Sequence, residues 1–451
     1  MSNEVLILLM WVALIVGLIG LGTHLGFTLM GIAVLAGLIG WEGYAFFAMF
    51  PIRIFAIIHN YILVAIPLFV FMGFMLERAG FADDLFAGGE LFMGRIRGGM
   101  AVMVVIITTI LAACTGIVAT GVIMAGVLAL PPMLRRGYNK GLALGSIAAG
   151  GTLGILIPPS IMLIFYASQT GLSVGKLFLA AFPAGFLLSM LFIIYIIIIT
   201  AIRPRMAPRL GEVPERTEYG VSESTLATSA HPRLRAFRAF LPVAFLIAAV
   251  LGSIMVGFAS PTEAAACGGA GAIVIAATYR KLNFKNLLDA SLHTCGMMGM
   301  FGAIFIGAMC FTSIFAGLGG RQIVFDLIMG LDLPPLGILL TILGIVVMLG
   351  MFIDWVAILL IILPTMIPIS VTMGWDQLWF GMLICVALQT AWLTPPLGYS
   401  LFFLRGLNMP GVTMADITWG AVPFVLLQVI GVGLLIAFPQ ILLFLPGLVF
   451  K

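Results

Sequence analysis

Charged side chains are scarce in this sequence: Asp, Glu, Lys and Arg make up only 8% of its 451 residues, whereas 63% are hydrophobic. Soluble domains carry about 25% charged residues, so the composition excludes an ordinary soluble protein. Apolar runs of about 20 residues, the length of a helix that crosses a bilayer, recur from end to end. We therefore expect an all-α integral membrane protein embedded in the lipid bilayer.

Motifs for enzymes and for nucleic-acid binding are also missing. The sequence has no His-Glu-x-x-His, no Gly-x-Ser-x-Gly and no P-loop, and its four histidines lie far apart. Its five cysteines are scattered and never form Cys-x-x-Cys, which argues against a disulfide framework or a metal site. The N-terminus lacks the basic region of a signal peptide, and we take it as the first span. We expect no organic cofactor and no nucleic-acid partner, and an intramembrane enzyme is the rival hypothesis.

Glycines and prolines interrupt two of the apolar segments. Gly150–Ser160 reads Gly-Gly-Thr-Leu-Gly-Ile-Leu-Ile-Pro-Pro-Ser, and Leu393–Gly398 reads Leu-Thr-Pro-Pro-Leu-Gly. Glycine weakens a helix and proline removes a backbone donor, so each segment is predicted to be a broken helix. In a membrane, an opened backbone must be satisfied by protein, water or an ion. Two interrupted segments in corresponding halves indicate the binding site of a transporter.

The two halves repeat at a fixed offset, because Pro158 and Pro395 are 237 residues apart (395 − 158). The predicted first repeat is 1–202 (scaffold spans in 1–80, hairpin and broken helix in 98–170), followed by a cytoplasmic loop at 203–238 and a second repeat at 239–451 (scaffold spans in 239–316, hairpin and broken helix in 335–404). Hairpin legs of 15–18 residues reach only about 22–27 Å, so they are predicted to be re-entrant. The expected fold is an inverted-repeat transporter with about 10 spans, two re-entrant hairpins and two broken helices.

Single spans are expected at 4–22, 24–41, 60–79, 177–202, 239–257, 260–280, 294–316 and 412–446, with an irregular stretch around Pro51 and an amphipathic piece at 281–285. Charge supports this topology. All but four of the 21 Lys and Arg residues then lie on the side of the central loop, the exceptions being Arg53, Lys176, Arg321 and Lys451. This bias follows the positive-inside rule and predicts an inner-membrane protein with both termini in the periplasm.

Hairpin tips and helix breaks are expected to meet near the bilayer midplane. Helix N-termini there attract a carboxylate, and unwound carbonyls and hydroxyls coordinate a cation such as Na⁺. The candidates are Thr115, Thr120, Thr152 and Ser160 in the first half and Asp354, Gln389, Thr390 and Thr394 in the second. For any single hydroxyl, a bond to its own helix is the alternative. Asp354 is the sharpest candidate because an intramembrane carboxylate is costly, although it could simply cap the second leg of its hairpin.

At these residues the sequence resembles the large membrane subunit of tripartite ATP-independent periplasmic (TRAP) transporters. The matching stretches are Ala65–Phe69 with Gly73, Leu130–Met133 with Gly137-Tyr138, Gly150–Ser160, Ser173–Phe178, Ser260–Ala265, Trp379–Gly381 and Thr394–Gly398. The resemblance implies an elevator mechanism, in which sodium drives uptake of an organic acid. It also implies two partners, a small four-span membrane subunit and a periplasmic substrate-binding protein.

The same resemblance implies a sodium set and a substrate set. The sodium ligands would be Ala113, Thr115, Gly151, Thr152, Gly350, Asp354, Thr390 and Thr394, with substrate near Thr115, Thr152, Ser160 and Asp354. The first tip, Cys114–Ile117, lacks the serines of many relatives, and Ser313–Gly320 resembles a branch linked to 2-oxo acids and related monocarboxylates. A small monocarboxylate or 2-oxo acid is therefore expected. The alternative is a stand-alone sodium/dicarboxylate-type symporter that needs no receptor.

Overall fold

The computed structural model describes residues 2–20, 22–41, 44–82, 85–86, 96–208, 232–396 and 398–450, with the backbone alone at 19, 45, 112–114 and 232–240. The described residues form helices and no β-strand. Those before the central gap form α1 (Asn3–Ile15), a π-helical turn (Val16–Gly20), α2 (Leu25–Gly40), α3 (Met49–Ile58), α4 (Ala65–Arg78), α6 (Gly99–Thr115), α7 (Val118–Arg135), α8 (Lys140–Thr152), α9 (Ile161–Thr170) and α10 (Val174–Ile202).

After the gap the chain forms α11 (Pro232–Met255), α12 (Pro261–Thr278), α13 (Phe284–Gly317), α14 (Gly320–Met329), α15 (Pro335–Gly350), α16 (Trp355–Thr372), α17 (Gln377–Ala391), α18 (Tyr399–Gly406), α19 (Met414–Ala437) and α20 (Gln440–Val449). Six described helices are long and apolar enough to cross a membrane by length and composition: Tyr61–Arg78 (which includes a 3₁₀ turn before α4), α7, α10, α13, α16 and α19. An all-helical membrane protein is thus confirmed, and the number and direction of its crossings stay predictions.

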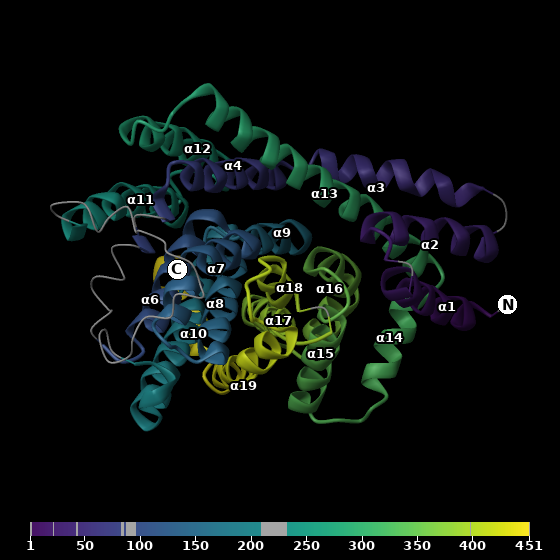
Figure 1. Ribbon diagram of the computed structural model, residues 1–451. Coiled ribbons are helices and arrows are strands. Elements are labelled where there is room, and N and C mark those ends of the chain that lie inside the picture. Colours follow the sequence, from purple (N-terminus) through teal and green to yellow (C-terminus); the bar gives the residue numbers. More distant parts are fainter. Residues whose placement is uncertain are drawn as a thin grey trace.

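The helices form two groups (Figure 1). In one, α4 packs against α12, and the long α13 packs against both α2 and α4. In the other, α8 packs against α6, α7 and α19, and α15 packs against α17. The crossing of α2 and α13 is close because Gly26 and Gly307 meet there: a Cβ on Gly26 would lie 2.9 Å from the backbone nitrogen of Ile304. The hairpins and broken helices thus lie together, beside the group that contains α13.

In the group that contains α8 and α17, helices of the first half of the chain begin and end at positions that recur in the second half. Adding 237 to the bounds of α7, Val118–Arg135, gives those of α16, Trp355–Thr372. Asn139, which caps α8 by accepting a hydrogen bond from Leu142 N at 3.2 Å, corresponds to Asp376, which caps α17. Both are residue types that favour the N-cap, so the sequence itself fixes these starts. Helices thus begin at equivalent positions in both halves of the chain, and the division into two inverted repeats stays a prediction.

Several predicted boundaries were wrong. The stretch around Pro51 is helical (α3) rather than irregular. The amphipathic piece and the span at 294–316 form one helix, α13, because no helix-breaking residue separates them. The last span, 412–446, is divided into α19 and α20 at Phe438 and Pro439. Within the predicted central loop, α11 begins at Pro232. Residues 209–231 of that loop lie outside the described residues, as do residues 87–95.

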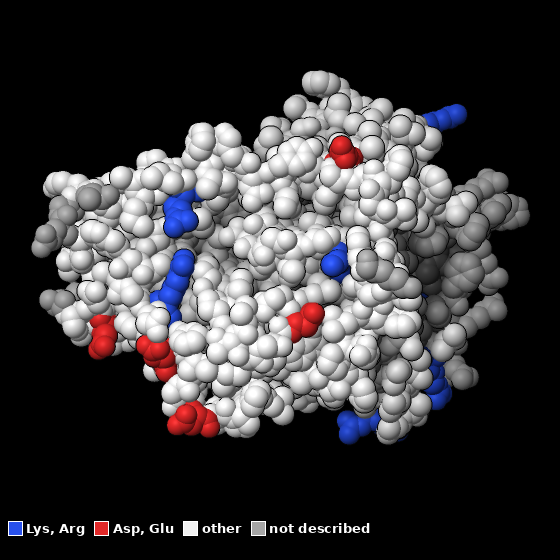
Figure 2. Space-filling view, turned by 180° about the vertical axis from the view of Figure 1, so that it is seen from behind, with Lys and Arg blue, Asp and Glu red and all other residues white. Residues whose placement is uncertain are grey.

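Much of the surface is apolar. Figure 2 shows one face on which charged side chains are few and widely separated. On α10, for example, Phe186, Ile194 and Ile198 are 65%, 45% and 51% exposed. Side chains of this kind on a helix that is long enough to cross a bilayer are expected to contact lipid.

Candidate functional site

The tip of the first hairpin lies against the first helix break. Gly116 joins α6 to α7 with a φ of +62°, a conformation that favours glycine. A Cβ added there would lie 2.8 Å from the carbonyl oxygen of Pro159, and one added to Gly154 would lie 3.3 Å from the backbone of Ile117. Only bare backbone at these positions permits so close an approach. The structure thus brings the first tip and the first break together.

Hydroxyl groups at this tip and break bond to their own chain. Thr115 Oγ1 donates to Leu111 O at 3.0 Å and accepts from Ile117 N at 3.4 Å. Ser160, fully buried, donates to Ile155 O across the break and accepts from Leu163 N at 3.3 Å, which caps α9. In this arrangement Ser160 stabilises the two ends of the break. Ala113 lies in the last turn of α6.

The two broken helices touch through Thr152 and two glutamines. Gln389 at the end of α17 and Gln428 in α19 each donate Nε2 to Thr152 Oγ1 at 3.2 Å. The Thr152 hydroxyl itself donates to Ala149 O at 2.7 Å. A hydroxyl has one donor and two acceptor sites, so that of Thr152 is fully used here. Its predicted contact with an ion or substrate would require one of the glutamines to move.

The second hairpin tip lies against the second break. A Cβ on Gly350, at the end of α15, would lie 2.6 Å from Ala391 Cβ in α17. Asp354 caps α16, where its Oδ1 accepts from Val356 N at 3.0 Å. This hydrogen bond is the capping role that the sequence offered as the alternative to ligand binding. It uses only Oδ1 of the carboxylate.

Polar groups without a hydrogen-bond partner flank the second break. Within the described part of the chain, these include Thr390 Oγ1, Trp392 Nε1 and Ser400 Oγ, together with Oε1 of Gln389 and of Gln428. Burial of an unpaired polar group costs about 1–3 kcal/mol, so such atoms are uncommon in protein interiors. Thr394, in contrast, donates to Thr390 O at 2.8 Å. The unpaired groups include both donors and acceptors.

The sequence did not single out Gln428, Trp392 or Ser400. Gln428 lies in the middle of a continuous helix, so no break marks it, and only its fully buried position shows its role. A polar residue within an apolar run is the one signal that could have indicated it. Trp392 and Ser400 lie on either side of the Pro395-Pro396 pair. Their closeness to that break in the sequence is the signal that could have indicated them.

The residues offer oxygen atoms rather than the soft ligands of a transition-metal site. Among the described side chains, no three His, Cys, Asp or Glu lie together in a way that could hold a metal ion. Hydroxyl, amide and carbonyl oxygens with a single carboxylate instead suit a hard cation. In proteins that transport ions, ligands of this kind select one ion and bind it weakly enough that it can be released.

Comparison with known proteins gives the same picture. The family model described as "Tripartite ATP-independent periplasmic transporter, DctM component" matches residues 9–441. The C4-dicarboxylate TRAP transporter large permease protein DctM of Pseudomonas aeruginosa is 29% identical over 397 residues, which cover 88% of each chain. The ectoine TRAP transporter large permease protein TeaC of Halomonas elongata is 28% identical, over 86% of this chain and 87% of TeaC. The sialic acid permease protein SiaM of Vibrio cholerae is 26% identical, over 87% of each.

Solved structures share the fold at lower identity. The YdaH transporter of Alcanivorax borkumensis aligns with a TM-score of 0.63 at 15% identity, over 92% of this chain and 98% of YdaH. MtrF of Neisseria gonorrhoeae, described in its title as one of a class of antimetabolite efflux pumps, gives a TM-score of 0.52 at 13% identity, over 84% of this chain and 80% of MtrF. At these identities the likeness shows a shared fold.

Proposed function

Because this chain belongs to the DctM family of tripartite ATP-independent periplasmic transporters, we propose that it is the membrane permease through which a sodium gradient drives uptake of a small organic acid. A periplasmic binding protein would deliver the acid, and a small four-span membrane subunit would assist. The observation that carries the proposal is the meeting of both helix breaks at Thr152 and Gln389, with each hairpin tip against its own break.

The proposed sodium ligands come from the two tips and breaks. The first set comprises Ala113, Thr115, Gly151 and Thr152, and the second comprises Gly350, Asp354, Thr390 and Thr394. Asp354 is the carboxylate among them, and a carboxylate within the apolar interior of a membrane protein calls for a compensating positive charge. In this conformation Thr390 Oγ1 has no partner among the described residues, so it is the threonine in these sets best placed to accept a cation.

The proposed substrate is a carboxylate, and a monocarboxylate or 2-oxo acid is the specific proposal. The carboxylate is supported by the unpaired donor groups at the second break, which belong to Thr390, Trp392 and Ser400, because carboxylate oxygens accept hydrogen bonds. Relatives named for C4-dicarboxylates, sialic acid and ectoine show how widely substrates vary within the family. The ligand retained by the cognate binding protein would identify the acid directly, and a dicarboxylate or sugar acid would overturn the monocarboxylate assignment.

We further propose that transport moves the hairpins and broken helices as a body past the group containing α13, as in an elevator. The recurrence of helix bounds at an offset of 237 supports two repeats, and an odd number of crossings in each would invert them. The proposed location is the bacterial inner membrane with both termini in the periplasm. Accessibility of cysteines introduced near Ser2 and Phe450 to a membrane-impermeant reagent tests the orientation.

The decisive experiment is reconstitution of this chain with its small subunit in vesicles. Uptake that requires both an inward sodium gradient and added binding protein is the expected result. Uptake without binding protein would favour the alternative, a stand-alone sodium/dicarboxylate-type symporter. Uptake indifferent to sodium would refute the coupling, and chemical conversion of the substrate would revive an intramembrane enzyme.

A further inference from the structure

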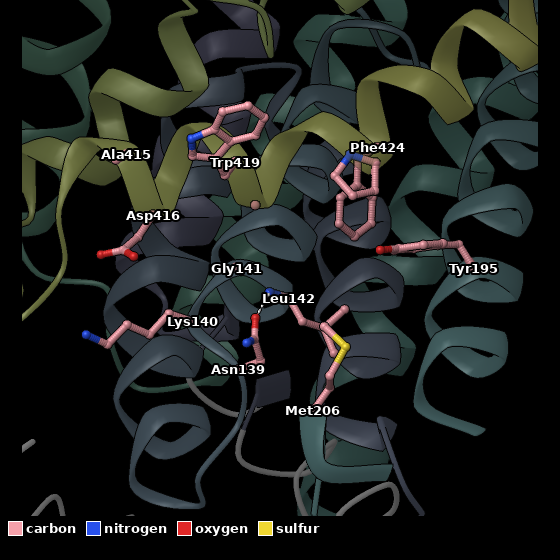
Figure 3. A pocket seen from close by; sticks show the side chains of 12 residues that line it. Asn139, Lys140, Gly141, Leu142, Tyr195, Met206, Ala415, Asp416, Trp419 and Phe424 are labelled. Carbon is pink, nitrogen blue, oxygen red and sulfur yellow. Dashed lines mark hydrogen bonds between the residues drawn. The ribbon is translucent and has the colours of Figure 1, made fainter. Parts of the chain in front are cut away.

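A hollow of about 430 Å³ lies at one end of the bundle, away from the tips and breaks. It is bounded by the first residues of α8, the last turns of α10 and the first three turns of α19 (Figure 3). Lys140 precedes Thr152 by 12 residues, which places the hollow about 18 Å from the candidate site along α8. The hollow is therefore separate from the proposed transport site.

The floor of the hollow is backbone, because two glycines meet where α8 crosses α19. A Cβ on Gly420 would lie 2.9 Å from Gly141 Cα, and one on Gly141 would lie 3.4 Å from Gly420 Cα. Both glycines line the hollow. Without side chains at the crossing, the space above it stays open to a ligand.

The rim combines charge with amphipathic aromatic side chains. Figure 3 shows Lys140 and Asp416 on one side of the hollow, Trp419 above it, and the Tyr195 hydroxyl directed into it from α10. The Asp416 carboxylate is engaged by the Thr413 backbone nitrogen at 2.9 Å and hydroxyl at 2.7 Å. Lys140 Nζ donates to Gly411 O at 2.5 Å, which leaves its other hydrogens for an anion.

Basic residues lie near the lining residues in sequence, and an apolar stripe extends from the hollow. Arg135 and Arg136 precede Lys140 in the chain, and Arg203 and Arg205 precede Met206, whose carbonyl accepts from Asn139 N at 2.8 Å. From Trp419, which is 74% exposed, an exposed apolar stripe continues along α19 through Val422, Leu426, Val429 and Ile430. These residues recur at a spacing of three or four and so lie on one helix face.

We propose that this hollow binds the headgroup of an anionic phospholipid, with the phosphate beside Lys140 and an acyl chain along the exposed stripe of α19. Basic pockets between membrane helices bind such headgroups, and Trp and Tyr favour the level of the headgroups. A free phosphate would satisfy Lys140 but not the apolar wall of Met206, Phe424 and the stripe. This proposal does not depend on which substrate the protein transports or on the ion that drives it.

Native mass spectrometry of the detergent-solubilised full-length chain, titrated with dioleoylphosphatidylglycerol, tests the proposal. Lys140→Ala is expected to bind this lipid about fivefold more weakly, equivalent to about 1 kcal/mol for one basic residue near the membrane surface. Trp419→Ala is expected to weaken binding as well, through loss of apolar contact. The matched control is Lys176→Ala at the opposite end of α10, where Nζ lies 5.9 Å from the Phe450 ring, and it should bind like the parent protein.

Two further arms identify the source of the phosphate. Dioleoylphosphatidylcholine should bind more weakly than the anionic lipid, and excess inorganic phosphate should not displace the lipid. Equal lipid binding by Lys140→Ala and the parent protein would overturn the proposal, as would displacement by inorganic phosphate. An unchanged Tm of each variant shows that a loss of lipid is not a loss of fold.

Discussion

Gln389 Nε2 donates a hydrogen bond to Thr152 Oγ1 at 3.2 Å, and these two residues are separated by 237 positions, the offset that relates the two halves of the chain. Equivalent positions of the two repeats therefore contact each other directly. In a pair of elements related by a pseudo-two-fold axis, such a contact lies close to that axis. Transporters with internal repeats place their binding sites at the repeat interface, where this bond would lie under the proposed arrangement of two inverted repeats.

Removal of this contact should destabilise the protein. Thr152→Val should lower the free energy of unfolding by about 1–3 kcal/mol, because it leaves the buried Nε2 groups of Gln389 and Gln428 without their acceptor. Gln389→Leu should cost less, because Thr152 Oγ1 keeps its bond from Gln428. The double variant should cost less than the sum of the two, since both partners are then absent. Thermal unfolding of the four proteins in one detergent measures this coupling. Strictly additive losses would show that the bond contributes nothing.

Asp354→Asn should impair sodium dependence without unfolding the protein. Asn is as good an N-cap as Asp, so the bond from Val356 N can persist while the charge is lost. We expect the sodium concentration for half-maximal uptake to rise by about tenfold to a hundredfold, since an interaction with a charged group is worth about 1.5–3 kcal/mol. Sodium titration of uptake in vesicles measures the change.

Asp376→Asn is the matched control for this prediction. Asp376 caps α17 in the same way, by accepting from Trp379 N at 2.8 Å, but lies exposed at the start of the helix. It should keep the parent's sodium dependence. If Asp354→Asn also kept it, the carboxylate would have only a capping role, and the second sodium set would be wrong.

The capping box of α12 should affect stability alone. Glu263 accepts from Ser260 N at 2.8 Å and from the Ser260 hydroxyl at 2.7 Å, at the start of the helix. Ser260→Ala should lower stability by about 0.5–2 kcal/mol, and Glu263→Ala should lower the Tm in the same direction. Neither should change the sodium concentration for half-maximal uptake. A shift in that concentration would indicate that Glu263 takes part in ion binding.

Gly116→Ala should disturb the contact between the first hairpin tip and the first helix break. Two costs arise: the positive φ, about 1–2 kcal/mol for a residue with a Cβ, and the contact with Pro159 O at 2.8 Å. Gly171→Ala supplies the control, because Gly171 has a similar φ of +73° with no atom within 4 Å of the added Cβ. Uptake should fall much further for Gly116→Ala than for Gly171→Ala. Equal losses would mean that the tip does not need its contact with the break.

The sequence predicted the class of fold well because membrane helices are marked locally. Length and hydropathy indicate a span, and Gly, Pro and capping residues indicate where it stops, so the predicted segment 335–404 begins with α15 at Pro335 and ends within α18. Boundaries failed where the signal was weak. The division at Phe438 and Pro439 lies within a continuous apolar run, and polar residues at the start of α13 suggested a separate piece that does not exist.

By itself, then, the sequence determined a helical membrane protein with two interrupted segments at a fixed offset, because glycine, proline and burial in lipid act on each segment alone. Only the tertiary structure decided which polar groups meet. It placed Gln428 on Thr152 from a third helix, used the Ser160 hydroxyl to join the ends of its break, and left Thr390, Trp392 and Ser400 without partners among the described residues. Hydrogen bonds between distant helices depend on how those helices pack, and no local pattern of residues records that.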